Sequence, residues 1–213
     1  RREKGRSSFS SVFVDAAGER QIVNFRDMAL SFDAGWLEAD IPHDVDAILA
    51  DTRWPAGAAS AMIAARRLGV PGILDAEAPV REAQEALEHA SHIAFSAQGL
   101  RDFAGMEDLD RALAAARAQT GAWVCYTNGE KGAVFLDGAT GGRVPAFGVD
   151  IVDTLGAGDV WHGAFALALG EGQAETEAIR FANAVAAIKC TRFGGREGTP
   201  DRIETDRFLR AAA

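Results

Sequence analysis

The sequence lacks several features that would place a protein in a class at once. Its 213 residues include only two cysteines, Cys125 and Cys190, and neither has the spacing of a metal site or a disulfide framework. No apolar run approaches the roughly 20 residues that a membrane-spanning helix needs. The first residues also lack the apolar core of a secretory signal peptide. We therefore expect a reduced, cytoplasmic protein that makes no membrane contact.

A shortage of positive charge excludes a further class of partner. The chain carries 22 Lys and Arg against 31 Asp and Glu, which gives a formal net charge of −9 at pH 7. Such a chain repels a polyanion on average, so we expect no nucleic-acid partner, while a local cationic group can still hold a small anionic substrate. With 48% hydrophobic and 25% charged residues, the composition is that of an ordinary globular domain with a core.

What the sequence does contain is a glycine-rich turn ahead of an apolar helix pattern. Residues 152–159 read Val-Asp-Thr-Leu-Gly-Ala-Gly-Asp, and the helix pattern runs on from Val160 to Leu169. Glycines allow a sharp turn that presents backbone N–H groups at a helix start, where anions and above all phosphate oxygens bind. Asp159 opens this helix, and its carboxylate would repel a resting phosphate. It therefore suits a base beside a phosphoryl group in transit.

Two other interpretations of the turn are less favoured. A dinucleotide-binding fingerprint requires a third glycine, and Trp161 stands at that position. A turn with only a structural role does not require acidic residues on both sides, whereas here Asp153 and Asp159 flank it. The arrangement favours a kinase.

Elsewhere in the chain, short apolar segments alternate with helical ones. The pattern predicts strands at 45–50, 71–75, 93–95, 122–127 and 133–136 and helices at 57–68, 80–90, 99–104, 109–119 and 174–193. Such alternation predicts βαβ units, hence an α/β fold whose mostly parallel sheet has helices on both faces and ligands at the carboxyl ends of its strands. Residues 8–14 and 20–24 flank turn-forming residues and predict a β-hairpin.

The motif from Asp153 to Asp159, Asp-Thr-x-Gly-Ala-Gly-Asp, resembles the second signature of the ribokinase-like (PfkB) carbohydrate kinases, with Trp161 in place of the usual Phe. The segment Val14–Arg20 is similar to the family's lid hairpin, although an ordinary edge hairpin is the alternative. The resemblance implies a ribokinase-like fold, with residues 1–25 in a small β-sheet lid and residues 26–213 in the α/β body. Members of the family are about half as long again, and position 1 is not Met, so we expect the N-terminal part to be absent.

The resemblance also implies roles for individual residues. The amides of Gly156, Ala157 and Gly158 would form an anion hole, and Asp159 would accept the proton of a sugar hydroxyl. The loop after the strand at 122–127 matches a Thr-x-Gly-x-x-Gly pattern that lies along the nucleotide. The implied ATP contacts are Thr127, Gly129, Gly132 and, at the adenine pocket, Asn183. A common strand-to-strand turn and a solvated helix face are the respective alternatives.

The implied cofactors are ATP and Mg²⁺. Many members carry Asn-x-x-Glu after a central strand, but residues 96–99 read Ser-Ala-Gln-Gly. We therefore assign no protein metal ligand and expect ATP and water to hold Mg²⁺. The loop 191–200 resembles one that wraps the nucleotide and, in ribokinases, a monovalent cation; Gly198 replaces the Ser that often holds this ion, which argues against it.

Residues 23–24, 49–54 and 187–201 resemble the sulfofructose kinases of this family, which phosphorylate 6-deoxy-6-sulfofructose at O1. By that resemblance Asn24 and Arg53 grip the sulfonate of an anionic sugar. Pairing of Arg53 with Asp51 or another carboxylate is the alternative. A homodimer through the lid is also implied. Two other functions stay open, namely a kinase for a neutral sugar or nucleoside and a non-catalytic binding relative.

Overall fold

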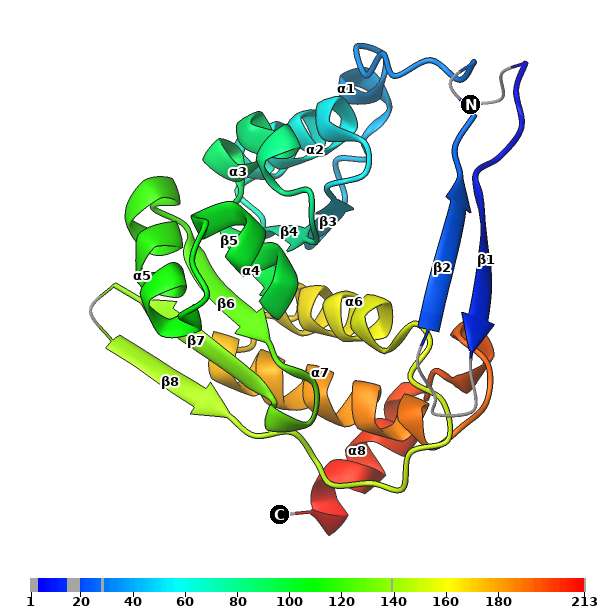
Figure 1. Cartoon of the computed structure of the whole chain (residues 1–213). Coiled ribbons are helices and arrows are strands. Elements are labelled where there is room, and N and C mark those ends of the chain that lie inside the picture. The colour runs from blue at the N-terminus through cyan, green and yellow to red at the C-terminus, as the bar shows by residue number, and fades with distance from the viewer. Residues whose placement is uncertain (1–3, 15–19, 28, 139, 213) are drawn as a thin grey trace. The chain divides into compact units, whose positions relative to one another are not determined.

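The computed structural model describes residues 4–14, 20–27, 29–138 and 140–212 (Figure 1). The chain divides into two compact units, Arg1–Asp33 and Ala34–Ala213, and each is described by itself. Among the described residues, no helix combines the length and the apolar composition that crossing a bilayer requires.

The first unit is built on a β-hairpin, as the sequence predicted. Strand β1 (Phe9–Val14) pairs antiparallel with β2 (Arg20–Phe25) in a register that places Phe9 opposite Phe25. The connecting residues 15–19, which include most of the segment that resembles the lid motif, lie outside the described residues.

One face of this hairpin is apolar and exposed. The period of two along each strand puts on it Phe9, Phe13, Val23 and Phe25. The rings of Phe9 and Phe25 stack with their centroids 5.1 Å apart. Asn24 lies on the other face, where its Oδ1 accepts a hydrogen bond of 2.6 Å from the Ser10 hydroxyl. A two-stranded hairpin is too small to bury these side chains by itself.

The second unit contains a single sheet of six strands in the order in which they follow along the chain. They are β3 (Ile48–Asp51), β4 (Gly72–Ala76), β5 (His92–Ser96), β6 (Trp123–Thr127), β7 (Ala133–Asp137) and β8 (Thr140–Val144). Strands β3 to β6 are parallel, and β7 and β8 continue as an antiparallel meander. The predicted α/β fold with a mostly parallel sheet is confirmed. Strand β8 was not predicted, because two of its five residues are glycines.

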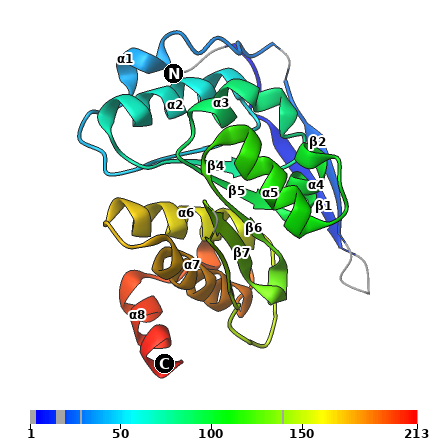
Figure 2. The ribbon, with the colours of Figure 1, turned by 90° about the vertical axis from the view of Figure 1, so that its left-hand side faces the viewer.

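Helices cover both faces of this sheet (Figures 1 and 2). They are α1 (Leu37–Asp40), α2 (Pro55–Leu68), α3 (Gln84–His89), α4 (Ala97–Ala104), α5 (Leu109–Thr120), α6 (Ala157–Gly170), α7 (Glu175–Cys190) and α8 (Arg202–Ala211). Helices α2 to α5 pack on one face and α6 with α7 on the other. Neighbouring residues of β4 illustrate the two layers, since Leu74 belongs to the first core and Ile73 to the second, both fully buried.

Two helix predictions were wrong in extent. The segment predicted as one helix over 80–90 is a 3₁₀ turn, Arg81–Ala83, followed by α3. The helix predicted to reach residue 193 ends at Cys190, whose carbonyl accepts hydrogen bonds from the backbone N–H groups of Val152 and Asp153, at 2.8 and 3.2 Å. The end of α7 is thus bonded to the segment before α6 instead of continuing as helix.

The turn between β6 and β7 requires one of its two glycines for a steric reason. Gly132 has φ +80°, and a Cβ placed on it would lie 2.2 Å from the Val144 carbonyl oxygen. Gly129 has φ +52°, but a Cβ there would meet no atom within 4 Å. We conclude that Gly132 is fixed by packing against the segment after β8, whereas the space beside Gly129 is open.

Replacement of these two glycines should therefore differ in cost. Gly132→Ala combines a left-handed φ with a backbone clash and should lower the free energy of unfolding by more than about 2 kcal/mol. Gly129→Ala has only the conformational cost, about 1 kcal/mol. Urea unfolding of both variants measures the difference, and equal losses would show that the crowding at Gly132 is relieved by a backbone shift.

Candidate functional site

The start of α6 lies in a turn that Asp153 organises. The Oδ1 atom of Asp153 accepts a hydrogen bond of 2.8 Å from the Leu155 N–H, and its Oδ2 accepts one of 3.0 Å from the Gly194 N–H. The side chain of this signature residue therefore ties the loop before α6 to the loop after α7. The motif suggested that Asp153 has a function, and in the structure its carboxylate holds two loops in place.

The first turn of α6 is open to a ligand. Gly156 is the N-cap residue with φ +73°, a left-handed conformation that favours glycine. The Ala157 N–H already donates to the Thr154 carbonyl at 3.1 Å. Gly158 is exposed, and a Cβ placed on it would meet nothing within 4 Å. The prediction that the Ala157 amide forms part of an anion hole is therefore wrong, and since N–H groups in the first turn of a helix lack intrahelical acceptors, the candidate donors are those of Gly158 and Asp159.

Asp159 places a carboxylate beside these amides. Its side chain is exposed, and its Oδ2 lies 3.8 Å from the point at which a Gly156 side chain would begin. The structure thus brings together two of the predicted elements, the glycine turn and the candidate base, at one helix start. A group held by the amides and a hydroxyl next to it would both lie within reach of this carboxylate.

Beneath this turn lies a buried histidine that the sequence analysis missed. His162, which is 4% exposed, has Nδ1 2.8 Å from the Gly158 carbonyl oxygen and Nε2 3.4 Å from Asp75 Oδ1. Nε2 also lies 3.3 Å from the Ala94 carbonyl oxygen. Through this ring the first turn of α6 is joined to β4 and β5. The available signal was a lone titratable residue inside the apolar run from Val160 to Leu169.

The carboxyl edge of β4 carries a concentrated negative field. Burial raises the pKa of the Asp75 carboxyl, the His162 ring lowers it in part, and Asp159 is the next charge that raises it. Glu77 and Asp51 act in the same direction. Asp159 is therefore close enough to Asp75 to be felt electrostatically. Such a field attracts a metal cation and repels a phosphate group whose charge is not neutralised.

Two of the predicted nucleotide contacts lie where a ligand can reach them, and two have structural partners. Thr127 follows β6 and is half-buried, with its hydroxyl 3.5 Å from the Phe95 carbonyl oxygen. Gly129 is exposed, and Gly132 is buried against the segment after β8. Asn183 is 5% exposed, so the alternative of a solvated helix face is wrong.

The amide of Asn183 is occupied by the protein itself. Its Oδ1 accepts a hydrogen bond of 2.7 Å from Trp161 Nε1, and its Nδ2 donates to the carbonyls of Val144 and Pro145 at 3.3 and 2.9 Å. Gly132 packs against the same Val144 carbonyl. Both residues therefore fix the segment that follows β8.

Arg53 lies just beyond the carboxyl end of β3. Its backbone N–H donates to Asp51 Oδ1 at 2.8 Å, and its guanidinium Nη1 donates to the Ala78 carbonyl at 3.1 Å. The bond to Asp51 is made by the Arg53 backbone, so it does not test the alternative of an ion pair between the guanidinium and a carboxylate. Asn24 belongs to the other unit.

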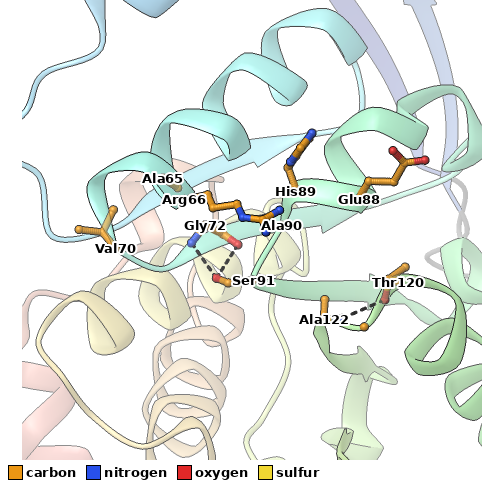
Figure 3. A pocket seen from close by; sticks show the side chains of 11 residues that line it. Ala65, Arg66, Val70, Gly72, Glu88, His89, Ala90, Ser91, Thr120 and Ala122 are labelled. Atoms are coloured by element: carbon orange, nitrogen blue, oxygen red, sulfur yellow. Dashed lines mark hydrogen bonds between the residues drawn. The ribbon is translucent and has the colours of Figure 1, made fainter.

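Two hollows lie away from Asp159. One of about 270 Å³ lies at the amino ends of the strands, where the Ser91 hydroxyl bonds to the backbone of Gly72 (Figure 3). The other, of about 550 Å³, follows the edge strand β3 from Leu37 to Trp54 and has mostly apolar walls. Ligands of α/β sheets bind at the carboxyl ends of the strands, which favours the start of α6 over the first hollow. The described residues contain no cluster of three or more side chains suited to hold a metal ion.

The raised pKa of Asp75 makes a prediction about stability. A carboxyl with a higher pKa in the folded than in the unfolded state contributes stability that is fully present below its unfolded pKa, about 4, and is lost as pH rises through the folded pKa. Asp75→Asn should therefore become more stable relative to wild type as pH rises from about 4 to 7.5. Urea unfolding across this range measures the trend, with the exposed Asp44→Asn as a flat control. A growing loss of stability in Asp75→Asn would instead show that pairing with His162 outweighs burial.

Comparison with known proteins agrees with this geometry. The model of the pfkB family carbohydrate kinases matches residues 1–202. Ribokinase of Bacillus subtilis is 34% identical over 141 residues, which cover 66% of this chain and 46% of that protein. The chain thus spans less than half the length of this curated relative.

Solved ribokinase structures share the fold. Ribokinase from Thermotoga maritima has a TM-score of 0.80 at 27% identity, with 97% of this chain and 70% of that chain covered. Ribokinase from Arabidopsis thaliana, complexed with ribose and ATP, has a TM-score of 0.83 at 24% identity over the same shares. With the family model covering almost all of its residues, the chain belongs to the PfkB family of carbohydrate kinases and has the ribokinase-like fold.

Proposed function

We propose that the protein is an ATP-dependent sugar kinase in which Asp159 is the general base. The observation that carries this proposal is the exposed start of α6, where Asp159 Oδ2 lies next to Gly156 and the space beside Gly158 is empty of protein atoms. A helix start alone would only bind an anion. The adjacent carboxylate adds the group that a hydroxyl needs in order to attack a phosphoryl centre.

The mechanism assigns each group one task. The carboxylate of Asp159 accepts the proton of the sugar hydroxyl as the oxygen attacks the γ-phosphorus, and ADP leaves. The amides of Gly156 and Gly158 would donate to the phosphoryl oxygens, on which negative charge is spread in the transition state, whereas the Ala157 N–H, predicted as a third donor, is bonded to the Thr154 carbonyl. Mg²⁺ held by ATP and water would supply charge neutralisation to the transferred phosphate, and no side chain of this protein is assigned as its ligand. The chain's acidic edge at Asp75 and Asp51 suits a metal that ATP and water hold.

The nucleotide border combines contact and support. Thr127 ends β6 and is half-buried, and Gly129 lies exposed in the turn that follows, so these two are the proposed contacts for ATP. Gly132 and Asn183 are proposed to support this nucleotide site indirectly, because both hold the segment after β8 in place. Exposed apolar side chains also occur in the loops joined by Asp153, namely Ile151, Val152, Leu155 and Phe193. Such exposed groups beside a polar turn are typical of a ligand-binding surface.

The proposed substrate is a sugar with an anionic group, in the manner of 6-deoxy-6-sulfofructose phosphorylated at O1. The support within the second unit is Arg53, a guanidinium beyond the carboxyl end of β3, and Asn24 is proposed as a further contact from the sequence resemblance alone. A planar guanidinium fork matches sulfonate oxygens, which a neutral sugar does not need. The second candidate is a neutral sugar, favoured by the similarity to Bacillus ribokinase. The reaction would take place in the cytoplasm, where ATP is supplied.

The hairpin is the proposed lid, and its apolar face is the proposed contact of a homodimer. Phe9, Phe13, Val23 and Phe25 are between 39% and 60% exposed, which leaves one side of a two-stranded sheet uncovered. A second copy of the hairpin would bury these side chains by the hydrophobic effect. A purely sugar-binding relative without catalysis would have no use for Asp159.

Removal of the base tests the proposed chemistry. Asp159→Asn should lower kcat for sugar phosphorylation by ~10²-fold or more, since general-base catalysis contributes 10² to 10⁴, while the KM for ATP stays near wild type. Steady-state kinetics measure both, with the exposed Asp150→Asn as a control of equal charge change. Near-normal turnover in Asp159→Asn would overturn the assignment.

Two glycines of one helix provide a matched test of the anion hole. Gly158 and Gly163 both lie in α6, are exposed, and have no atom within 4 Å of a built Cβ. Either Gly→Ala change should raise the free energy of unfolding by up to about 1 kcal/mol, because alanine is the better helix former. Only Gly158→Ala should reduce activity, by roughly tenfold or more, since its methyl group occupies the space proposed for phosphate. Equal activities in the two variants would show that the phosphate does not bind beside Gly158.

Arg53 decides between the two substrate classes. Arg53→Ala should raise KM for sulfofructose by ~30-fold or more and hardly change KM for fructose, because a charge-assisted bidentate contact is lost only with the anionic sugar. Arg66→Ala, at the far end of α2, removes an equal charge as a control. Equal losses on both sugars would make Arg53 a structural residue.

A further inference from the structure

A buried ammonium group lies directly behind the glycine turn. Lys189 is in the last turn of α7, and its side chain is 0% exposed. Lysine is almost never fully buried unless it is paired, because removing its charge from water is costly. Here Nζ donates a hydrogen bond of 2.8 Å to the Asp153 carbonyl oxygen and lies 3.7 Å from Asp153 Oδ2. The charge of Lys189 is therefore directed at the first residue of the signature.

The oxygens that Lys189 contacts belong to the junction of two loops. Asp153 bonds through its carboxylate to the N–H groups of Leu155 and Gly194, as described above. The carbonyl of Cys190, the residue after Lys189, accepts from the N–H groups of Val152 and Asp153. The ammonium thus sits where the loop before α6 meets the loop after α7. Loss of its charge would leave the partly buried Asp153 carboxylate without its cation.

Gly198 lies against the same lysine side chain. It is buried, and a Cβ placed on it would lie 3.5 Å from Lys189 Cε, at ordinary van der Waals distance. This is the position at which the sequence differs from relatives that hold a monovalent cation with Ser. Gly198 therefore lies in contact distance of the Lys189 side chain, and a larger residue at position 198 would lie next to the ammonium group.

We propose that the Lys189 ammonium is a built-in cation of the phosphate-binding turn. It holds a main-chain carbonyl and a carboxylate of Asp153, the kind of oxygen ligands that a bound alkali cation would otherwise bring together. An ammonium is a compact, strongly hydrated point charge, so it can replace such an ion in a way that the planar guanidinium of Arg cannot. The protein consequently requires no added monovalent cation. This inference rests on the proposed function only in that the turn is taken to bind phosphate.

The test compares the wild type with Lys189→Ala and Lys189→Met in K⁺, NH₄⁺ or tetramethylammonium at constant ionic strength. The alanine variant leaves room for a small cation, whereas methionine removes the charge and fills the space. Breaking the buried pair should lower the Tm of either variant by about 10 °C. We expect K⁺ and NH₄⁺ to restore several degrees to Lys189→Ala and none to Lys189→Met, with tetramethylammonium ineffective on both. The wild type should respond to none of the three.

Activity gives a second readout. Lys189→Ala should lose on the order of 10-fold or more in kcat/KM for ATP and recover with K⁺ or NH₄⁺, since supporting residues around a cation contribute effects of this size. Activation of the wild type by K⁺ would overturn the proposal, and this experiment needs no variant that might fail to fold. Failure of K⁺ and NH₄⁺ to raise the Tm of Lys189→Ala would reduce Lys189 to an ordinary buried ion pair.

The two readouts separate this inference from the proposed kinase activity. The Tm series needs no substrate and tests Lys189 even if no sugar is phosphorylated. Conversely, an active wild-type kinase that K⁺ stimulates contradicts the built-in cation and leaves the proposed function intact. As a further variant, Lys189→Ala combined with Gly198→Ser supplies a hydroxyl beside the vacated position and should respond to K⁺ at least as strongly as Lys189→Ala alone.

Discussion

The buried contact between Lys189 and Asp153 is the interaction on which the rest of the site depends. An open helix start is only useful if the turn that exposes it is rigid, because loose amides would lose their alignment on a bound anion. Asp153 supplies this rigidity through its two carboxylate oxygens, which join the loop before α6 to the loop after α7. The fully buried Lys189 ammonium lies 3.7 Å from one oxygen of that partly exposed carboxylate. Because Lys189 is fully buried, it leaves exposed the first turn of α6, which is the proposed phosphate site.

A second support comes from the sheet. The His162 ring joins the Gly158 carbonyl to Asp75 and to the β5 backbone, so the helix start is fixed relative to the carboxyl ends of the parallel strands. Strand β3 ends at Asp51 on the same edge of the sheet, and Arg53 follows two residues later. Asp159, the candidate base, and Arg53, the candidate residue for binding an anionic sugar, therefore belong to one structural unit. The fold thus accounts for how residues from distant parts of the sequence converge on one place.

The sequence predicted the parts of the site whose chemistry is carried by consecutive residues. Gly156 to Asp159 could be read directly, because a glycine turn, a helix start and a carboxylate form one short motif. The alternation of strands and helices likewise predicted the sheet and its layers. By contrast, Lys189 and His162 acquire their roles from partners in other elements, and the sequence of their own helices does not show which residues those partners are. Strand β8 was missed because its pairing with β7, and not its glycine-containing sequence, makes it a strand.

Asn183 shows that a residue predicted as a ligand contact can have a structural role instead. Its position was read as a nucleotide border, yet its amide is bound to Trp161 and to the backbone after β8. Sequence pattern can mark such a residue as part of a site without telling whether it touches the ligand or supports a residue that does. The side-chain contacts decide, and here they indicate support.

The central claim is that the start of α6 transfers a phosphoryl group from ATP to a sugar hydroxyl. The most direct test incubates the protein with Mg²⁺, ATP and, in separate reactions, sulfofructose, fructose or ribose, and follows the products by ³¹P NMR. The account predicts a sugar phosphate-ester resonance that grows in equal amount with ADP for at least one sugar. Formation of ADP with inorganic phosphate alone, or no consumption of ATP with any of the three sugars, would contradict it.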